Sequence, residues 1–335
     1  MSFPSLVDPI LSRRDLSSEQ AEALMDWLIS GDATDAQIGG ALLALRVKGC
    51  TTAEIAAFVR AMRSRMSFIG HRYDNLVDTC GTGGGIPTFN ISTAAALIAA
   101  AAGVKVAKHG NRSMTGQGSA DVLEALGIPF KSEPDAAIHQ LETTNIVFLF
   151  APSHHPAMRH VAQARRELGL RTVFNQLGPL ANPAAATRQL IGVYDRGLMR
   201  SMGETLRELG CDRALLVHGR EGLDEISPVT VTDFVQVENG RVFDGSFSPA
   251  EFGLEPVSPE DLNPGADIAA SAELLIEAIT DPDSPRARAV RPNAAAAIWL
   301  GGVAQSLREG AEIARETVAS GAARRKLDSL REVRP

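Results

Sequence analysis

The first seventy residues alternate apolar and polar positions at the spacing of amphipathic helices. Apolar side chains recur every three or four residues over 17–29, 34–48 and about 52–66. Each stretch opens on residues that commonly cap helices, and a glycine follows each of the first two. The candidate caps are Ser17, Asp32 or Thr34, and Thr51 or Thr52. This pattern predicts a small N-terminal helical domain over residues 1–72.

The pattern changes from residue 76 onward. Residues 76–78 end a first expected strand, and short apolar runs rich in β-branched residues follow at 104–107, 146–150, 191–194 and 214–217. Helical stretches alternate with them at 94–102, 120–126, 157–168 and 198–209. This alternation is typical of a larger α/β domain with a central, mostly parallel sheet. Asn239-Gly240 indicates the turn of an added antiparallel hairpin, and two further helices are expected at 293–307 and 311–327.

Composition narrows the possible functions. The chain has 335 residues, of which 22% are charged, and a formal net charge of −7. This balance disfavours nucleic-acid or membrane-surface binding, which requires a basic face. The apolar run at 94–103 is too short to span a bilayer, and the first twenty residues lack the pattern of a signal peptide. Three scattered cysteines without CxxC spacing indicate reduced thiols, so we expect a cytoplasmic protein.

A glycine-rich segment follows the expected strand at 76–78. Backbone without side chains can approach a ligand closely and present its N–H groups. The glycines of this segment are Gly81, Gly83, Gly84 and Gly85, and the polar residues that lead into the next helix are Thr88, Asn90, Ser92 and Thr93. A helix N-terminus with such residues suits an anion. A plain strand–turn–helix connection looks the same, and the glycines alone do not separate the two interpretations.

The next expected strand, 104–107, ends directly on basic and polar residues. Lys108, His109, Asn111 and Arg112 follow it. Ligands of open α/β sheets bind at the carboxyl ends of strands, and cations are costly to bury there without partners. A second glycine-rich loop follows and leads through Ser119 into another helix. Two such helix entries beside a basic strand end favour a pocket for a multiply phosphorylated small molecule.

Two further segments are compatible with this pocket. Pro156 suits the first turn of a helix from which His155 and Arg165 could point toward the pocket. By themselves, His154 and His155 are more typical of capping or surface histidines, and Arg165 of a solvated helix charge. Asp224 and Glu225 follow the expected strand end at 218–219 and suit Mg²⁺, which prefers oxygen ligands. An exposed acidic turn is the alternative there.

These segments together resemble the anthranilate phosphoribosyltransferases. The resemblance covers nearly the whole chain and rests on GTGGG…TFNIST, KHGNR, GSADVLEALG, RRELGLRTVFNQLGPLANP and GLDEIS, in that order. It implies transfer of a phosphoribosyl group from phosphoribosyl pyrophosphate (PRPP) to anthranilate in tryptophan biosynthesis, with Mg²⁺ as cofactor. It also implies a homodimer formed through the helical domain. Helices around 156–184 would pack onto residues 1–72, and residues 73–155 with 185–335 would form the PRPP-binding domain.

The resemblance also implies roles for particular residues. The PRPP-binding set would be Gly81, Gly84, Gly85, Thr88, Asn90, Ile91, Ser92, Thr93, Lys108, Asn111 and Ser119. Anthranilate would meet Gly81, His109, Asn111 and Arg165. Lys108, His109 and Arg165 would be the catalytic residues, and Ser92, Asp224 and Glu225 would contact the metal.

Two loops depart from the family pattern. The first usually carries an aspartate after GTGG that interacts with the metal-bound cofactor, whereas here Gly85 stands in its place and the loop is one residue shorter. The second loop, SMTGQ at 113–117, is also one residue shorter and lacks the usual paired serines and basic residue. With one acid missing, Asp224 and Glu225 are expected to be the main metal anchors.

The implied reaction needs electrostatic stabilisation more than a strong base. Breaking the C–O bond at C1 of the ribose leaves negative charge on pyrophosphate, whereas an aromatic amine is already an uncharged nucleophile. Three alternatives remain open: a transferase of the same fold with another aromatic acceptor, a pyrimidine nucleoside phosphorylase, and a non-enzymatic nucleic-acid-binding relative. The last is disfavoured by the net charge.

Overall fold

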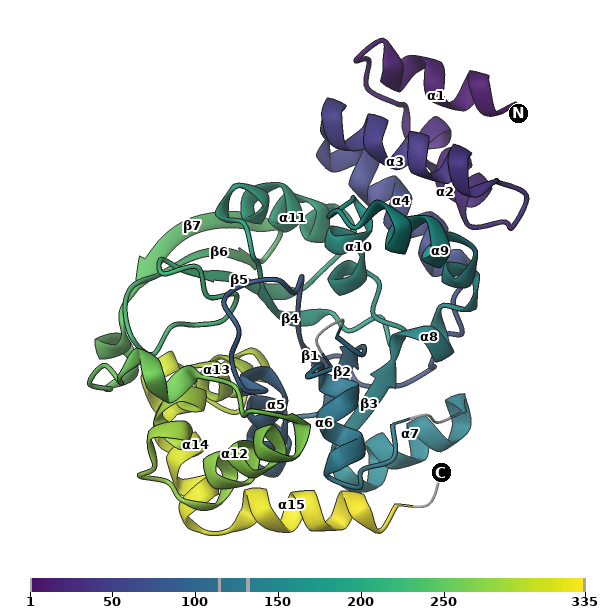
Figure 1. Ribbon diagram of the computed structural model, residues 1–335. Coiled ribbons are helices and arrows are strands. Elements are labelled where there is room, and N and C mark those ends of the chain that lie inside the picture. The colour runs from purple at the N-terminus through teal and green to yellow at the C-terminus, as the bar shows by residue number, and fades with distance from the viewer. Residues whose placement is uncertain (1, 114–115, 131–132, 334–335) are drawn as a thin grey trace.

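Four N-terminal helices form a separate layer at one end of the molecule (Figure 1). The computed structural model describes residues 2–113, 116–130 and 133–333. The four helices are α1 (Phe3–Leu11), α2 (Ser18–Leu28), α3 (Asp35–Lys48) and α4 (Thr52–Ser64). Ser17, Thr34 and Thr51 each form a capping box with a Gln or Glu three residues later, so the three predicted helices are confirmed with these caps. Helix α1, which contains Pro9, was not predicted.

A seven-stranded sheet forms the centre of the described part of the chain, in the order β3-β2-β1-β4-β5-β6-β7. Its strands are β1 (Val77–Gly81), β2 (Val106–Gly110), β3 (Ile146–Phe150), β4 (Arg188–Gly192), β5 (Arg213–Gly219), β6 (Thr232–Glu238) and β7 (Arg241–Phe247). Strands β1 to β5 pair in parallel, and β6 and β7 add the predicted antiparallel hairpin. The predicted α/β class with a mostly parallel sheet is confirmed.

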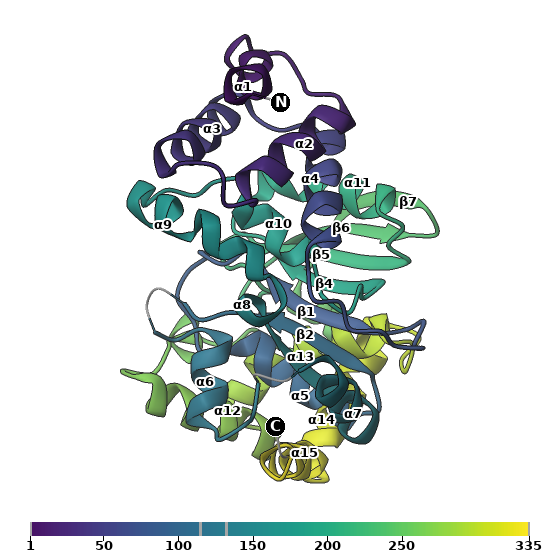
Figure 2. The ribbon, with the colours of Figure 1, turned by 90° about the vertical axis from the view of Figure 1, so that its right-hand side faces the viewer.

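Successive residues of each strand bury their side chains on opposite faces of the sheet. In β5, Leu215 and Val217 join one hydrophobic cluster, and Ala214 and Leu216 join another. Figure 2 shows helices on both sides of the sheet. The helices that follow α4 are α5 (Ile91–Ala101), α6 (Ser119–Ala125), α7 (Pro134–Thr144), α8 (Ala151–His154), α9 (Arg159–Leu168), α10 (Phe174–Leu180), α11 (Arg196–Glu208), α12 (Ile268–Thr280), α13 (Pro285–Leu300), α14 (Leu307–Ala319) and α15 (Ala322–Arg331). Three short 3-10 helices are η1 (Pro156–Met158), η2 (Pro249–Phe252) and η3 (Pro259–Leu262).

The two helices predicted for the C-terminal tail are wrong in their limits. The helix predicted at 293–307 is α13, which begins eight residues earlier and ends at Leu300, before Gly302 takes a positive φ of 80°. The helix predicted at 311–327 is two helices, because Gly321 adopts φ 74° and breaks the chain between α14 and α15. Helices α7 and α12 were not predicted.

The basic strand end also needs correction. Lys108 and His109 were predicted to follow the strand, but they lie within β2, which continues to Gly110. Lys108 is buried, and its Nζ donates hydrogen bonds to the Thr79 carbonyl and to Ser92 Oγ, the latter at 3.2 Å. These partners on a neighbouring strand and helix allow a charged side chain to lie inside the strand. The first polar residue after the apolar run was therefore not the end of the strand.

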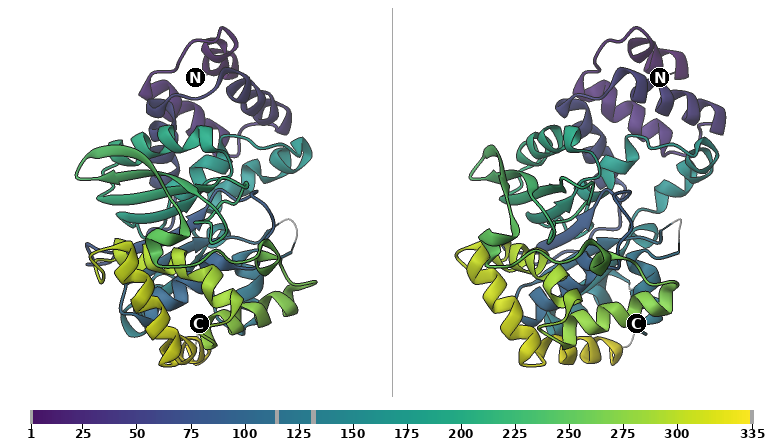
Figure 3. Two further views of the ribbon diagram at one scale, coloured as in Figure 1. Left: turned by 90° about the vertical axis from the view of Figure 1, so that its left-hand side faces the viewer. Right: turned by 60° about the vertical axis from the view of Figure 1, so that its left-hand side comes forward.

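The segment from η1 to α10 lies between the N-terminal helices and the sheet (Figures 2 and 3). Helix α9 contacts α3, and α10 contacts α4. Val161 and Ala164 of α9 share a hydrophobic cluster with Leu42 and Leu45 of α3. This segment therefore brings side chains of its own to the carboxyl ends of the strands, beside the N-terminal layer.

The order of the strands reverses beside β1. Strands β2 and β3 lie on one side of it and β4 and β5 on the other. Such a switch point leaves a crevice at the carboxyl ends of the strands, where α/β sheets bind ligands. The backbone N–H of Thr82, just beyond β1, donates to the Gly192 carbonyl at the end of β4 at 2.8 Å.

Candidate active site

A cavity of about 540 Å³ opens at this switch point. Both layers contribute to its walls: Met62 comes from α4, Phe174 and Pro179 from α10, and Gly81 and His109 from β1 and β2. Gly81, His109, Asn111 and Arg165, the four residues expected to meet an aromatic acid, all line it. We call this space the central cavity.

Two neutral histidines form part of its wall. The rings of His109 and His155 lie 5.2 Å apart between centroids, and both side chains are buried. Burial, with the neighbouring histidines acting in the same direction, lowers the pKa of His109 to about 3, and burial lowers that of His155 to about 4. The Nε2 atom of each ring has no hydrogen-bond partner within the described residues. Buried polar atoms usually have partners, so these two nitrogens in residues of the cavity wall are exceptions to that rule.

Arg165 supplies a positive charge in the same wall. Its guanidinium lies over the Phe174 ring at 5.0 Å from the centroid, and burial lowers its pKa. Among residues 2–113, 116–130 and 133–333, it forms no ion pair with a carboxylate. An unpaired guanidinium in an apolar wall can bind the carboxylate of a planar acid through two parallel hydrogen bonds.

A second group of residues lies beside the cavity, at the entry to α5. We define the cation–carboxylate cluster as Ser92, Lys108, Asp224 and Glu225. Burial and the adjacent charge of Asp224 raise the pKa of Glu225 to about 8, while the charge of Lys108 and hydrogen bonds from Ser92 act in the opposite direction. Burial likewise lowers the pKa of Lys108. Lys108 and Glu225 therefore share Ser92 as a partner.

Asp224 packs directly on the first glycine-rich loop. A Cβ atom at Gly85 would overlap its Oδ1 atom, and a Cβ atom at Gly192 would overlap its backbone carbonyl. Burial raises the pKa of the Asp224 carboxyl, and the backbone N–H of Gly85 partly offsets this by hydrogen bonding to it. The space that an acidic side chain would need at position 85 is therefore already filled by Asp224.

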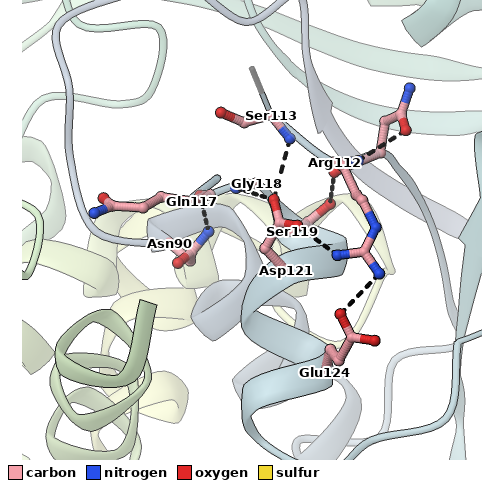
Figure 4. Close-up of polar contacts among 9 residues, drawn as sticks. Asn90, Arg112, Ser113, Gln117, Gly118, Ser119, Asp121 and Glu124 are labelled. Carbon is pink, nitrogen blue, oxygen red and sulfur yellow. Dashed lines mark hydrogen bonds and ion pairs between the residues drawn. The ribbon is translucent and has the colours of Figure 1, made fainter. Parts of the chain in front are cut away.

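Asp121 anchors both ends of the second loop (Figure 4). Its carboxylate accepts hydrogen bonds from the backbone N–H groups of Ser113, at 3.2 Å, and Gly118, at 2.9 Å. Its other oxygen pairs with Arg112 at 2.7 Å, and Arg112 also pairs with Glu124. Asn90 donates to the Gln117 carbonyl at 3.1 Å, which joins this loop to the start of α5. Within SMTGQ, residues 114 and 115 lie outside the described part of the chain.

The other residues expected to hold PRPP surround α5 and α6. Thr88 precedes α5, and Ile91 and Thr93 are buried in its first turn. Gly84 adopts φ 95°, which favours glycine. Ser119 begins α6, and its Oγ lies where a Cβ at Gly110 would be. The predicted site residues thus come from elements that meet at one switch point, and of these Thr88 is placed only by its position before α5.

Comparison with known proteins agrees with this arrangement. Two family models match: the glycosyl transferase family helical bundle domain over residues 4–66 and the glycosyl transferase family a/b domain over residues 73–324. The anthranilate phosphoribosyltransferase of Alkaliphilus metalliredigens is 44% identical over 97% of this chain and 96% of its own length. The chain belongs to the anthranilate phosphoribosyltransferase family.

Solved structures of family members have the same fold. The crystal structure of anthranilate phosphoribosyltransferase from Thermus thermophilus is 40% identical and superposes with a TM-score of 0.92, covering 98% of both chains. The enzyme from Saccharomyces cerevisiae in complex with PRPP and Mg is 28% identical, with a TM-score of 0.88 over 99% of this chain and 97% of its own. The same yeast enzyme is also solved in complex with 4-fluoroanthranilate.

The donor set in this family member fits Mg²⁺. Asp224 and Glu225 are adjacent carboxyl groups beside the Ser92 hydroxyl. Within the described ranges, no group of three or more histidine, cysteine or acidic side chains could hold a metal by itself. Mg²⁺ is commonly bound by one or two carboxylates together with substrate phosphates and water, which matches this pair.

Sequence reasoning missed part of the site. Met62 and Phe174, which the sequence did not single out, lie in the cavity wall. His155, for which both a position toward the pocket and a capping or surface role were left open, also lies there. Apolar residues that line a cavity look like ordinary core residues in a sequence, so no local signal distinguishes them.

None of the helices in the described ranges is long and apolar enough to cross a membrane.

Proposed function

We propose that this protein transfers the phosphoribosyl group of PRPP to the amino group of anthranilate, which yields N-(5-phosphoribosyl)anthranilate and pyrophosphate. The observation that carries the proposal is the position of the central cavity beside the cation–carboxylate cluster at one switch point. An aromatic acid and a phosphorylated sugar can therefore meet there. Membership of the family supports the same activity, in tryptophan biosynthesis.

On the acceptor side, we assign Arg165 to the anthranilate carboxylate and His109, Asn111 and Gly81 to its ring and amino group. The depressed pKa of His109 keeps its imidazole neutral at physiological pH. The ring therefore does not repel Arg165, and a ring nitrogen can accept a hydrogen bond from the substrate. Catalysis on this side is positioning: the amine is held next to C1 of the ribose, and water is excluded by the apolar wall.

On the phosphate side, we assign the N-terminus of α5 (Asn90, Ile91, Ser92 and Thr93), the glycine-rich loop (Gly81, Gly84, Gly85 and Thr88), and Lys108, Asn111 and Ser119 to PRPP. As the C1–O bond breaks, pyrophosphate leaves with the electron pair, while the amine nitrogen forms the C1–N bond and loses a proton. Lys108 and the helix N–H groups stabilise the charge that develops on the leaving group. Mg²⁺ held by Ser92, Asp224 and Glu225 would supply further charge stabilisation.

The experiment that tests this function follows anthranilate fluorescence. The purified protein should consume the signal only when PRPP and Mg²⁺ are both present, and a chelator should stop the reaction. Persistence of the signal at high protein concentration would refute the proposal. Phosphorolysis of thymidine by the same preparation would point to the nucleoside phosphorylase alternative. Consumption of a substituted anthranilate but not of anthranilate itself would point to a different acceptor.

We also propose the domain division, the assembly and the location that the family suggests. Residues 1–72 with 156–184 would form one domain, and residues 73–155 with 185–335 the other. Exposed apolar side chains at Leu11, Leu43 and Val47 of the N-terminal layer support a homodimer through that layer. Analytical ultracentrifugation of the protein and of a Val47→Lys variant would test the dimer, and cell fractionation would test the cytoplasmic location.

A further inference from the structure

Arg171 lies at a junction that the assigned roles do not explain. It belongs to the short connection between α9 and α10, on the side of the N-terminal layer (Figure 2). Its side chain reaches across to the glycine-rich loop beyond β1. There its Nη2 donates to the Gly84 carbonyl at 2.6 Å, and the guanidinium lies 3.8 Å from the centroid of the Tyr194 ring beyond β4.

This contact depends on the glycine at position 84. A Cβ atom there would overlap the Arg171 guanidinium, and Gly84 also has a positive φ of 95°. The Arg171 backbone is fixed in turn, because Arg46 of α3 donates to its carbonyl. The guanidinium is therefore held by the glycine-rich loop and by the Tyr194 ring beyond β4, and the Arg171 backbone is held by the N-terminal layer.

The opposite side of the same peptide group faces Asp224. The described residues contain no cis peptide bonds, so the carbonyl of Gly84 and the N–H of Gly85 point in opposite directions. Arg171 binds the carbonyl, and an added Cβ at Gly85 would overlap the Asp224 Oδ1 atom. Burial raises the pKa of the Asp224 carboxyl, and the backbone N–H of Gly85 acts in the opposite direction. One peptide group is thus held between a cation of the α9–α10 segment and a carboxylate beside the PRPP site.

We propose that Arg171 is a positioning residue that sets the orientation of the Gly84–Gly85 peptide and, through it, the placement of the Asp224 carboxylate. The loop carries no acidic side chain of its own, so its hold on the metal-binding pair passes through the backbone. Since Arg165 lies six residues earlier in the same segment, this contact connects the acceptor wall to the phosphate side. The inference rests on the proposed function for its kinetic readout.

The test compares Arg171→Ala and Arg171→Lys with Arg166→Ala, an exposed arginine of α9 that does not line the cavity. Loss of a hydrogen bond from a charged donor should raise the PRPP KM of Arg171→Ala by about tenfold and change the anthranilate KM by less than about twofold. Lysine keeps the charge but not the planar stacking, so Arg171→Lys should recover part of the loss. Arg166→Ala should match the unmodified protein.

A binding measurement makes the test independent of turnover. Mn²⁺ titrated into each variant in the presence of PRPP, with free Mn²⁺ followed by electron paramagnetic resonance, should bind about tenfold more weakly to Arg171→Ala. Equal rises in both KM values, or unchanged Mn²⁺ binding, would overturn the positioning role. If Arg171→Ala does not fold, as judged by circular dichroism, Arg171→Lys carries the same comparison. An unmodified protein that binds Mn²⁺ and PRPP but consumes no anthranilate would refute the proposed function and leave the Arg171 result standing.

Discussion

The central cavity and the cation–carboxylate cluster lie side by side, but their polar groups are satisfied in different ways. In the cavity, the Nε2 atoms of His109 and His155 have no partners and Arg165 forms no ion pair, within the described residues. In the cluster, Lys108 already bonds to Thr79 and Ser92, and Ser92 bonds to Glu225. The acceptor side is therefore preformed, whereas the phosphate side must exchange partners when its ligand arrives.

This difference predicts how each side responds to change. On the preformed acceptor side, each group meets the ligand directly, so each substitution should lower the affinity for anthranilate by the contribution of that one group. The groups of the cluster already bond to one another and must exchange these bonds for bonds to the ligand. Ligand binding and turnover on this side should therefore depend on metal and on pH. The predictions that follow test that division.

The largest effect is expected from Lys108→Met. Removing a buried cation that stabilises the leaving group should lower kcat by about 10² to 10³, while anthranilate affinity measured by fluorescence stays within about twofold. Steady-state kinetics at saturating anthranilate provide the measurement. Lys105→Met is the matched control, since Lys105 precedes the same strand and its Nζ contacts the carbonyls of Leu141 and Glu142 and the Tyr73 ring, none of which belongs to the proposed site. A loss below about tenfold would remove Lys108 from the proposed leaving-group site.

Arg165→Ala tests the acceptor side. Loss of a charged, bidentate partner should raise the anthranilate KM by about 10- to 100-fold, with a much smaller change in the PRPP KM. Initial rates measured against each substrate in turn provide the comparison. Equal rises in the two constants would contradict the separation between cavity and cluster.

Gly85→Asp tests the departure from the family pattern. Restoring the acid usual in the family should reduce kcat/KM by about tenfold or more, because its Cβ overlaps Asp224 Oδ1 and overpacking costs about 1–3 kcal/mol. Gly85→Ala has the same overlap without the charge and should show a similar loss. Activity equal to or above that of the unmodified protein would mean that Asp224 moves aside freely.

The pH dependence of the metal requirement gives the smallest effect. The pKa of Glu225 is raised to about 8, so at pH 7 its carboxyl holds a proton that Mg²⁺ must displace. The half-saturating Mg²⁺ concentration should therefore fall a few-fold, and at most about tenfold per pH unit, as pH rises from about 6.5 to 8.5. Glu225→Gln should flatten this dependence. A requirement that does not change with pH in the unmodified protein would exclude Glu225 as a titrating ligand.

The sequence predicted the fold class well because its signals are local. Helices α2, α3 and α4 have periodic apolar residues and capping residues, and strand β3 was predicted with its observed limits. The predicted helix limits in the C-terminal tail were wrong because Gly302 and Gly321 adopt positive φ angles that interrupt the helices. Composition does not reveal these angles. Strand β2 was predicted too short because the partners of Lys108 come from residues 16 and 29 positions away in sequence.

The candidate site was predicted only in part. Motifs identified the polar residues that converge on the switch point, such as His109 and Arg165. They did not identify Arg171, whose partners Gly84 and Tyr194 belong to separate loops. Nor did they reveal that Asp224 fills the space beside Gly85, since that depends on how two loops pack.

The most direct test of the account measures anthranilate consumption and pyrophosphate release together in one reaction with Mg²⁺ and PRPP. The account predicts that the two change in equal molar amounts, and that Lys108→Met and Arg165→Ala slow both to the same extent at low substrate concentration. Pyrophosphate release without anthranilate consumption, or anthranilate consumption without PRPP, would contradict the claim that cavity and cluster act on one shared reaction.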